Sequence, residues 1–106
     1  MEWIKVFENP EEAEKAVEEG KARKLVIDNI RICLTRSEGR FYAVQDACPH
    51  SGASLSEGWL NNYQEIVCPL HNYCYHLVTG REATQQTRDA KVYEVKVGED
   101  GLFVKV

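Results

Sequence analysis

The sequence has no long hydrophobic run and no excess of positive charge, and both absences exclude classes of protein. Its uncharged stretches fall far short of the ~18–20 apolar residues that a membrane-spanning helix needs. Residues 1–6 lack the basic start and apolar segment of a signal peptide. With 13 Lys and Arg against 17 Asp and Glu, the formal net charge of −4 argues against a nucleic-acid or anionic-membrane partner. We therefore expect a soluble cytoplasmic protein with no membrane anchor.

Catalytic groupings are also absent. The sequence shows no nucleophile–base pairing, no Gly-rich phosphate loop and no paired carboxylates. We therefore expect a protein that is not itself an enzyme. Its 106 residues match the size of one domain, residues 1–106, which can bury a core without disulfide bonds.

The N-terminal part predicts one short helix. Residues 3–7 alternate between apolar and polar side chains and predict a strand. Asn9 can cap a helix, Pro10 suits its first position, and Glu12 completes an arrangement like a capping box. We expect a helix over about residues 10–19.

The remaining pattern predicts an all-β fold. Short alternating segments are separated by tight turns, which is typical of an antiparallel sandwich or barrel. The predicted strands are residues 23–27, 30–35, 40–44, 91–97 and 102–106.

Residues 45–81 interrupt this rhythm. Within them only residues 65–67 and 75–77 look like strands, and Pro and Gly recur between these segments. The chain has no Lys or Arg between Arg40 and Arg81. A loop-rich insertion on a rigid β scaffold is a common place for function, so we expect the functional site here.

Two short motifs stand in the insertion. One is Cys48-Pro49-His50, and the other is Cys68-Pro69-Leu70-His71, with 17 residues between His50 and Cys68. In a reducing compartment, cysteines clustered beside histidines indicate a metal site. Each motif offers one thiolate and one imidazole, so the two loops together make a Cys₂His₂ set.

Two kinds of metal centre accept such a set. Zinc ligands usually occur as like pairs, two cysteines followed by two histidines. Here each half mixes the two ligand types, and a single zinc ion gives no reason for this alternation. In a [2Fe–2S] cluster with mixed ligation the two irons differ, so each loop can give one ligand to each iron. The cluster is the favoured interpretation, and a zinc-stabilised binding module without a redox role is the alternative.

The double motif resembles that of the Rieske-type [2Fe–2S] proteins. Residues 48–58 are similar to the first loop of that family, and residues 67–72 to its second loop. The family's Leu-x-Thr-Gly turn has its counterpart at residues 77–80, and the resemblance covers nearly the whole chain. It implies a Rieske-type antiparallel β sandwich or barrel, with a two-loop cluster-binding subdomain inserted at about residues 45–81.

The resemblance also implies a ligand set and a function. By it, Cys48 and Cys68 bind the inner iron of one [2Fe–2S] cluster, and His50 and His71 bind the outer iron near the surface. The respiratory branch of the family has a membrane anchor and a disulfide between the loops, whereas the chain lacks both cysteines of that disulfide. We therefore expect the soluble ferredoxin branch and a potential in the lower half of the family's range of about −150 to +300 mV.

Two kinds of soluble relative fit this resemblance. One is the Rieske ferredoxin, a one-electron carrier between a reductase and a terminal oxygenase or similar redox enzyme. The other is the small subunit of NAD(P)H-dependent nitrite reductase, whose cluster is one relay in a larger complex. We expect redox-protein partners in both cases and keep the nitrite reductase-like subunit as the alternative.

Three further positions bear on the cluster. In the respiratory branch a Tyr at the place of Tyr75 donates its hydroxyl toward a ligand cysteine, and we expect Tyr75 to raise the potential in this way. Its alternative role is packing, as a Phe would pack. Asn72 replaces the usual Gly but tolerates left-handed backbone. Residues 84–87 lack the usual Pro of the loop over the cluster, so we expect a less rigid loop.

The remaining Cys, His and aromatic side chains have simpler interpretations. We expect Cys33 to be a small packing residue on a strand. Cys74 and His76 repeat the Cys-x-His spacing but lie on a predicted strand, so we regard them as a weak second candidate for the ligand set. We expect three aromatic residues to cover the cluster: Trp59, Tyr63 and Tyr73.

Overall fold

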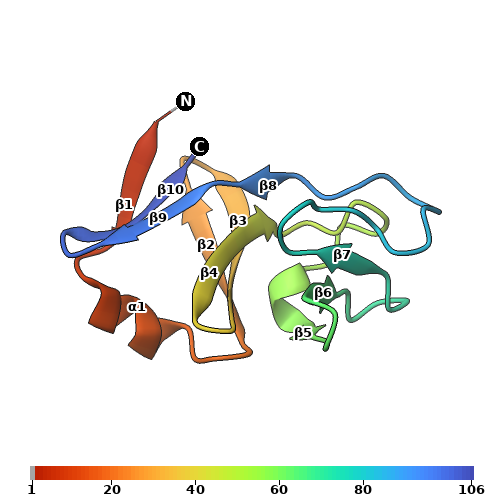
Figure 1. Cartoon of the computed structure of the whole chain (residues 1–106). Helices are drawn as coiled ribbons and strands as arrows, with labels where there is room; N and C mark the ends of the chain where they lie inside the picture. Colours follow the sequence, from red (N-terminus) through yellow and green to blue (C-terminus); the bar gives the residue numbers. More distant parts are fainter. Residues whose placement is uncertain (1) are drawn as a thin grey trace.

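The computed structural model describes residues 2–106, which form three antiparallel sheets and one α-helix (Figure 1). Among these residues no helix is long and apolar enough to cross a membrane. The predicted all-β class and the helix near the N-terminus are confirmed. The elements are β1 (Trp3–Phe7), α1 (Pro10–Ala16), β2 (Ala22–Ile27), β3 (Ile30–Ser37), β4 (Arg40–Gln45), the short 3₁₀ helix η1 (Leu55–Glu57), β5 (Trp59–Leu60), β6 (Glu65–Val67), β7 (Cys74–His76), β8 (Val92–Tyr93), β9 (Val95–Gly98) and β10 (Gly101–Lys105).

The middle layer is the sheet with strand order β2-β3-β4-β8, and both of its faces are covered. Neighbouring residues of one strand therefore enter different cores, because successive side chains point to opposite faces. Ile32 and Leu34 of β3 lie in one core, whereas Cys33 between them lies in the other. In β4, Ala43 and Val44 divide in the same way. This explains why residues 32–34 read as a continuous apolar run.

One face of the middle sheet packs against the chain ends. The sheet β1-β10-β9 contributes Leu102 and Val104, and α1 contributes Ala13, to the core that contains Ile32. Asn9 caps α1 by accepting a hydrogen bond from the Glu12 amide at 2.9 Å. The helix ends at Ala16, earlier than expected, because the chain then turns so that the Gly20 amide can donate to the Arg36 carbonyl.

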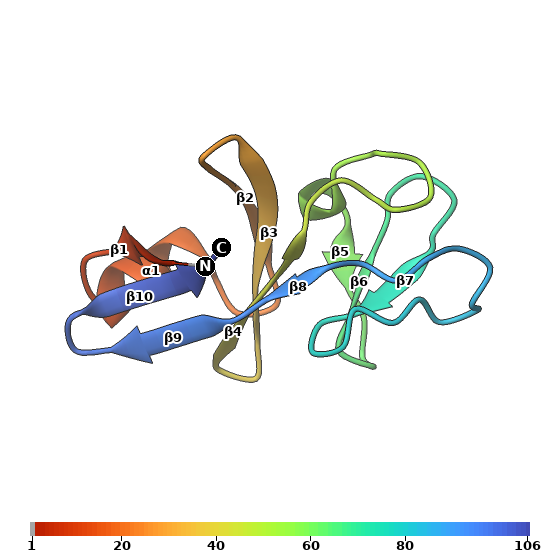
Figure 2. The ribbon, with the colours of Figure 1, turned by 90° about the horizontal axis from the view of Figure 1, so that it is seen from above.

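The other face packs against the sheet β5-β6-β7, which carries the loops of the insertion (Figure 2). This part of the molecule lies at the end opposite to the β1-β10-β9 sheet (Figure 2). The predicted strand at residues 91–97 is broken at Glu94. Its first part, β8, pairs with β4, and its second part, β9, pairs with β10, so the segment joins two sheets. The two-residue strand β5 was not predicted.

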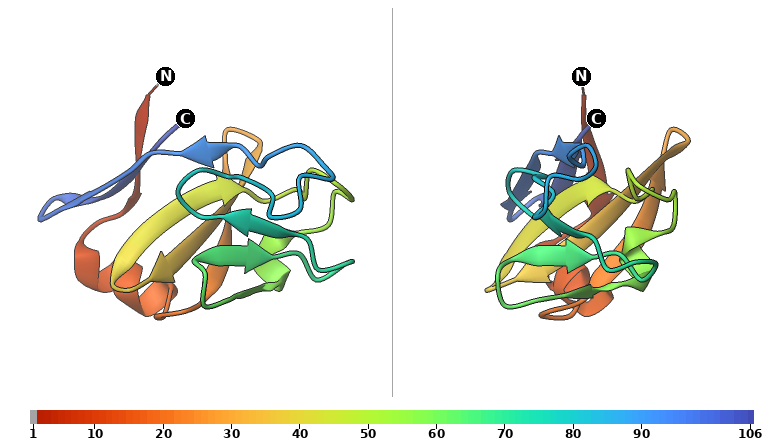
Figure 3. Two further views of the ribbon diagram at one scale, coloured as in Figure 1. Left: turned by 45° about the vertical axis from the view of Figure 1, so that its right-hand side comes forward. Right: turned by 90° about the vertical axis from the view of Figure 1, so that its right-hand side faces the viewer.

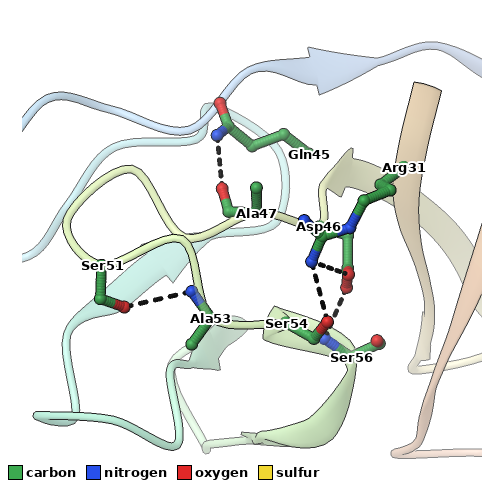
Figure 4. Close-up of polar contacts among 8 residues, drawn as sticks. All are labelled: Arg31, Gln45, Asp46, Ala47, Ser51, Ala53, Ser54 and Ser56. Carbon is green, nitrogen blue, oxygen red and sulfur yellow. Dashed lines mark hydrogen bonds and ion pairs between the residues drawn. The ribbon is translucent and has the colours of Figure 1, made fainter. Parts of the chain in front are cut away.

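A buried carboxylate fixes the entrance to the insertion (Figure 4). Asp46 follows β4 directly and its side chain is fully buried. One carboxylate oxygen accepts from the Ser56 amide at 2.9 Å, and the other accepts from the Arg31 guanidinium at 3.1 Å. The same guanidinium nitrogen donates to the Ser54 hydroxyl at 2.9 Å. Asp46 therefore joins β3 to both ends of the segment that contains the first Cys-His loop.

The pKa of Asp46 is below its ordinary value. Burial alone would raise this pKa, but hydrogen bonds from Ser56, Ser54 and Arg31 favour the carboxylate and outweigh that effect. A lowered pKa in the folded state gives stability that is present above the unfolded pKa of about 3.9 and is lost as the pH falls through the folded pKa.

We expect Asp46→Asn to lower the free energy of unfolding at pH 7 by about 1.5–3 kcal/mol, since hydrogen bonds to a charged group are lost. The difference from wild type should shrink as the pH falls below about 4, because the carboxylate of the unfolded state takes up a proton there, and that of the folded state follows at its lowered pKa. Urea unfolding at both pH values measures this, and Asp100→Asn in an exposed turn is the matched control. A pH-independent difference between Asp46→Asn and wild type would contradict the role of this charge.

Candidate metal centre

The first Cys-His loop is a tight turn between β4 and η1. The Cys48 amide donates to the Ala53 carbonyl at 2.8 Å, and the Gly52 amide donates to the Cys48 carbonyl at 2.7 Å. Gly52 has φ of +80°, a conformation that suits glycine. The Ser51 hydroxyl accepts from the Ala53 amide at 3.3 Å (Figure 4). These bonds close the loop locally, so that Cys48 is buried while His50 is exposed at its tip.

The second Cys-His loop connects β6 to β7. The Cys68 amide donates to the Tyr73 carbonyl at 2.8 Å and so closes the loop. His71 and Asn72 both have left-handed backbone, with φ of 72° and 60°. Asn72 therefore adopts the conformation that we expected of it. Cys68 is buried and His71 is exposed, as in the first loop.

The two thiols lie beside each other below the tips of the loops. The Ser51 hydroxyl of the first loop is 3.8 Å from the Cys68 sulfur of the second loop. Burial, followed by the interaction with the Cys48 thiol, raises the pKa of Cys68. Burial acts on Cys48 too, but hydrogen bonds from Tyr75 and Ser51 outweigh it and lower the pKa of Cys48. The Cys48 sulfur thus lies among donors that stabilise a thiolate.

Tyr75 provides one of these donors from β7. Its side chain is fully buried, and its hydroxyl oxygen is 3.3 Å from the Cys48 sulfur. Burial and the neighbouring Cys48 thiol raise the pKa of Tyr75 far above its ordinary value. The hydroxyl therefore keeps its proton and can donate a hydrogen bond to the sulfur. The potential-tuning role that we expect of Tyr75 requires this contact.

The two exposed imidazoles are neighbours at the surface. The ring centroids of His50 and His71 are 5.4 Å apart, and the rings meet edge to face. Tyr73 lies against His50, with 4.3 Å between the ring centroids. Tyr73 is therefore an aromatic cover for one imidazole, as expected.

A third loop, residues 82–87, borders the same surface. Together with the second loop it forms a groove of about 530 Å³, into which the imidazoles open. The groove is lined by side chains from all three loops and from β7: His50, His71, Asn72, Tyr73, Cys74, Glu82, Ala83, Thr84 and Gln86. All three loops gather at one end of the molecule (Figure 3).

The remaining Cys and His residues, Cys33, Cys74 and His76, have contacts of their own outside the four-residue set. Cys33 is fully buried in a strand and packs in the same core as Cys48, as expected. Cys74 lies on β7, and its sulfur contacts the Asn72 carbonyl at 3.5 Å. The His76 Nδ1 atom accepts from the Val78 amide at 3.1 Å, so this ring nitrogen serves a turn.

The expectation for two aromatic residues was wrong. Tyr63 is 77% exposed in the turn between β5 and β6, at the opposite end of β6 from the second loop. Trp59 is 51% exposed on β5. Tyr63 points to solvent because it lies in a turn, and Trp59 is half exposed because β5 is an edge strand.

Two buried carboxylates, Asp46 and Glu82, were not identified from the sequence. Both are fully buried close to the loops of the centre. The signal that could have found them is the series of Ser and Thr donors that follows each one, at Ser54 and Ser56 and at Thr84. Such donors also surround acids on ordinary protein surfaces, so the pattern alone is weak.

The donor set fits a cluster with mixed ligation better than a single metal ion. Among residues 2–106, no three His, Cys, Asp or Glu side chains are grouped as one ion would require. Instead the two thiols form an inner, buried pair and the two imidazoles an outer, exposed pair. A [2Fe–2S] cluster with Cys₂His₂ ligation divides its ligands in this way, with two thiolates on one iron and two imidazoles on the other.

Comparison with known proteins gives the same chemistry. The chain is 37% identical over 76 residues to the 3-phenylpropionate/cinnamic acid dioxygenase ferredoxin subunit of Photorhabdus laumondii. The aligned residues make up 71% of this chain and 72% of the relative. A solved chain from the complex of reduced oxygenase and oxidised ferredoxin in carbazole 1,9a-dioxygenase is 31% identical, with a TM-score of 0.81, over 96% of this chain and 100% of that one.

A third similarity concerns the fold alone. A protein of Mycobacterium tuberculosis described as an NADH-dependent nitrite reductase small subunit is 19% identical, with a TM-score of 0.83. The similarity covers 99% of this chain and 96% of that one. Residues 4–104 match the model of the Rieske [2Fe-2S] domain. The chain therefore belongs to the Rieske [2Fe-2S] domain family.

Proposed function

We propose that the protein is a one-electron carrier that holds a Rieske-type [2Fe–2S] cluster and passes electrons between a reductase and a terminal oxygenase. The observation that carries this proposal is that each loop buries its thiol and exposes its imidazole, so the two thiols form an inner pair and the two imidazoles an outer pair. The similarity to dioxygenase ferredoxins supports it. The bound cluster supplies one-electron redox chemistry, and the chain supplies its ligands and surroundings.

We assign Cys48 and Cys68 to one iron and His50 and His71 to the other. The buried thiols lie where the protein excludes water, and Tyr75 and Ser51 offer hydrogen bonds to them. The exposed imidazoles give electrons a short path to the surface. Residues 45–81 then form the cluster-binding insertion of one domain that spans residues 1–106.

The surface around the imidazoles suits a protein partner. Leu70, next to His71, is 48% exposed, and residues 41–80 contain no Lys or Arg. An apolar surface with few charges can be buried in an interface at little desolvation cost. The chain in this proposal carries electrons and leaves the chemistry on substrate to its partner. Free thiols at Cys33 and Cys74 fit a reducing cytoplasm.

The alternative partner is a nitrite reductase-like complex, in which the chain would be a bound subunit. The similarity in fold to such a small subunit supports this alternative. Purification of the untagged chain from its native host separates the two. A bound subunit elutes with a larger flavin- or haem-containing protein, whereas a free carrier elutes alone.

We expect the purified protein to contain about two irons per chain and to give an electron paramagnetic resonance signal only after reduction by dithionite. The average g-value should be low, as is typical of mixed His and Cys ligation. Iron and zinc are counted on the same sample. A silent, colourless sample with about one zinc ion and no iron would refute the proposed function.

Cysteine variants test the ligand assignment. We expect Cys68→Ser to lose the cluster, because a ligand to one iron is removed, while Cys74→Ser keeps the full iron content. The two positions are matched, since both thiols lie beside the second loop. Iron content and the visible spectrum measure the outcome. Retention of the cluster in Cys68→Ser together with its loss in Cys74→Ser would show that the ligand set is different.

A Tyr75→Phe variant tests the hydroxyl beside the Cys48 sulfur. Its hydrogen bond stabilises the more negative reduced state, so we expect its loss to lower the midpoint potential. A hydrogen bond to a charged group contributes about 1.5 kcal/mol, and 1.4 kcal/mol corresponds to about 59 mV for one electron, so the shift should be on the order of tens of millivolts. Tyr73→Phe is the matched control, because its hydroxyl donates to Gln86. An unchanged potential in Tyr75→Phe would mean that Tyr75 only packs.

A further inference from the structure

Glu82 is a fully buried acid beside the candidate metal centre, and its partners are neutral donors. Its carboxylate accepts from the Thr84 amide at 2.6 Å, the Thr84 hydroxyl at 2.8 Å and the Gln86 amide at 2.8 Å. A longer bond of 3.4 Å comes from the Thr87 amide. None of the ion pairs found among residues 2–106 includes Glu82.

A buried charge without a counter-ion is costly unless hydrogen bonds replace its hydration. Burial alone would raise the pKa of Glu82, but the bonds from Thr84, Gln86 and Thr87 outweigh it and hold this pKa below its usual value. Glu82 is therefore ionised at neutral pH. Because its donors all come from the segment that follows, the carboxylate organises residues 83–87 around itself.

This organised segment is a wall of the groove at the imidazoles. Glu82 pairs with Tyr75 as an isolated β-bridge, and the Ala83 amide donates to the Cys74 carbonyl at 3.0 Å, so the segment is attached to β7. At the groove the Tyr73 hydroxyl donates to the Gln86 side chain at 3.4 Å. Tyr73 in turn lies against His50. A chain of contacts thus runs from Glu82 to an exposed imidazole.

The charge of Glu82 also reaches the buried side of the centre. Burial is the main reason that the pKa values of Cys74 and Tyr75 are raised, and the negative charge of the Glu82 carboxylate adds a smaller contribution to both. The Tyr75 hydroxyl is in turn 3.3 Å from the Cys48 sulfur. Glu82 also lines the groove together with His50 and His71. A negative charge added to a cluster held by these imidazoles would therefore lie near the charge of Glu82, in a partly apolar environment where screening is weak.

We propose that Glu82 is a positioning residue that fixes residues 83–87 as the wall of the imidazole groove, and that its permanent negative charge lowers the reduction potential of the cluster. The reduction concerned is the addition of one electron to the cluster, with dithionite as the reductant in the test. This inference rests on the proposed function, since it requires the cluster to be held by the loops that contain Cys48 and Cys68.

The test compares Glu82→Gln with two matched variants. Glu82→Gln removes the charge while nearly keeping the size of the side chain. Glu99→Gln removes one negative charge from the exposed turn between β9 and β10, far from the groove (Figure 1). Thr84→Val keeps the charge of Glu82 and removes one of its donors. Midpoint potential is measured by dithionite titration, and amide hydrogen exchange is measured for residues 84, 86 and 87.

We expect Glu82→Gln to have a higher midpoint potential than wild type, and Glu99→Gln to have the wild-type value. Amide exchange at residues 84, 86 and 87 should be faster in Glu82→Gln, while Thr84→Val should have faster exchange with a smaller shift in potential. Equal potentials in Glu82→Gln and wild type, at full iron content, would refute the effect of the charge. Unchanged exchange in both Glu82→Gln and Thr84→Val would refute the positioning role.

The outcomes remain decisive if Glu82→Gln does not assemble. Thr84→Val then tests the positioning role by itself, because its amides at residues 86 and 87 must exchange faster if the carboxylate holds the segment. The proposed function fails separately, by the absence of iron and of a reduction-dependent signal in the wild-type protein. A wild-type protein with a normal cluster, combined with unaltered variants, rejects only the inference about Glu82.

Discussion

The burial of Tyr75 is the constraint on which the arrangement of the centre depends. Tyr75 is the largest fully buried side chain of the molecule as described, and a buried hydroxyl requires a hydrogen-bond partner. The Cys48 sulfur provides that partner from the first loop. The backbone of Tyr75 pairs on one side with Ile66, which leads into the second loop, and on the other side with Glu82 of the third loop. Tyr75 therefore holds the three loops beside one another, through its side chain to the first loop and through its backbone to the other two.

The middle sheet transmits this arrangement to the rest of the fold. Cys33 and Val44 share a core with Cys48 and Cys68, while their chain neighbours Ile32 and Ala43 belong to the core under α1. A displacement of β3 or β4 would therefore disturb both cores at once, because close-packed interiors have little free volume. The loops are short, closed by their own amides and mounted on a scaffold that is covered on both faces. Such a mounting limits how far the ligand side chains can move apart.

Local patterns explain which features could be predicted. The Asn9 cap, the turn at residues 28–29 and the paired Cys-His motifs each depend on residue types within a few positions, and all are present in the structure. The roles of Asp46 and Glu82 could not be predicted, because an acid that will be buried looks like one that faces solvent until the fold brings its donors together. The absence of Pro in residues 84–87 predicts a less rigid loop, and the sequence did not reveal that the Glu82 carboxylate accepts hydrogen bonds from the Thr84 and Gln86 amides of this loop. The break at Glu94 could not be predicted either, because the residues before it pair with β4 of one sheet and those after it pair with β10 of another.

The two ends of the described chain lie side by side, where the Glu2 and Val106 backbones exchange hydrogen bonds of 2.8 and 2.9 Å. Both ends lie away from the β5-β6-β7 sheet and its loops (Figure 1). A tether attached at either end, to an electrode or to a second protein, would leave the groove facing outward. Immobilised forms of the protein could then exchange electrons in solution through the surface that we propose for the carrier.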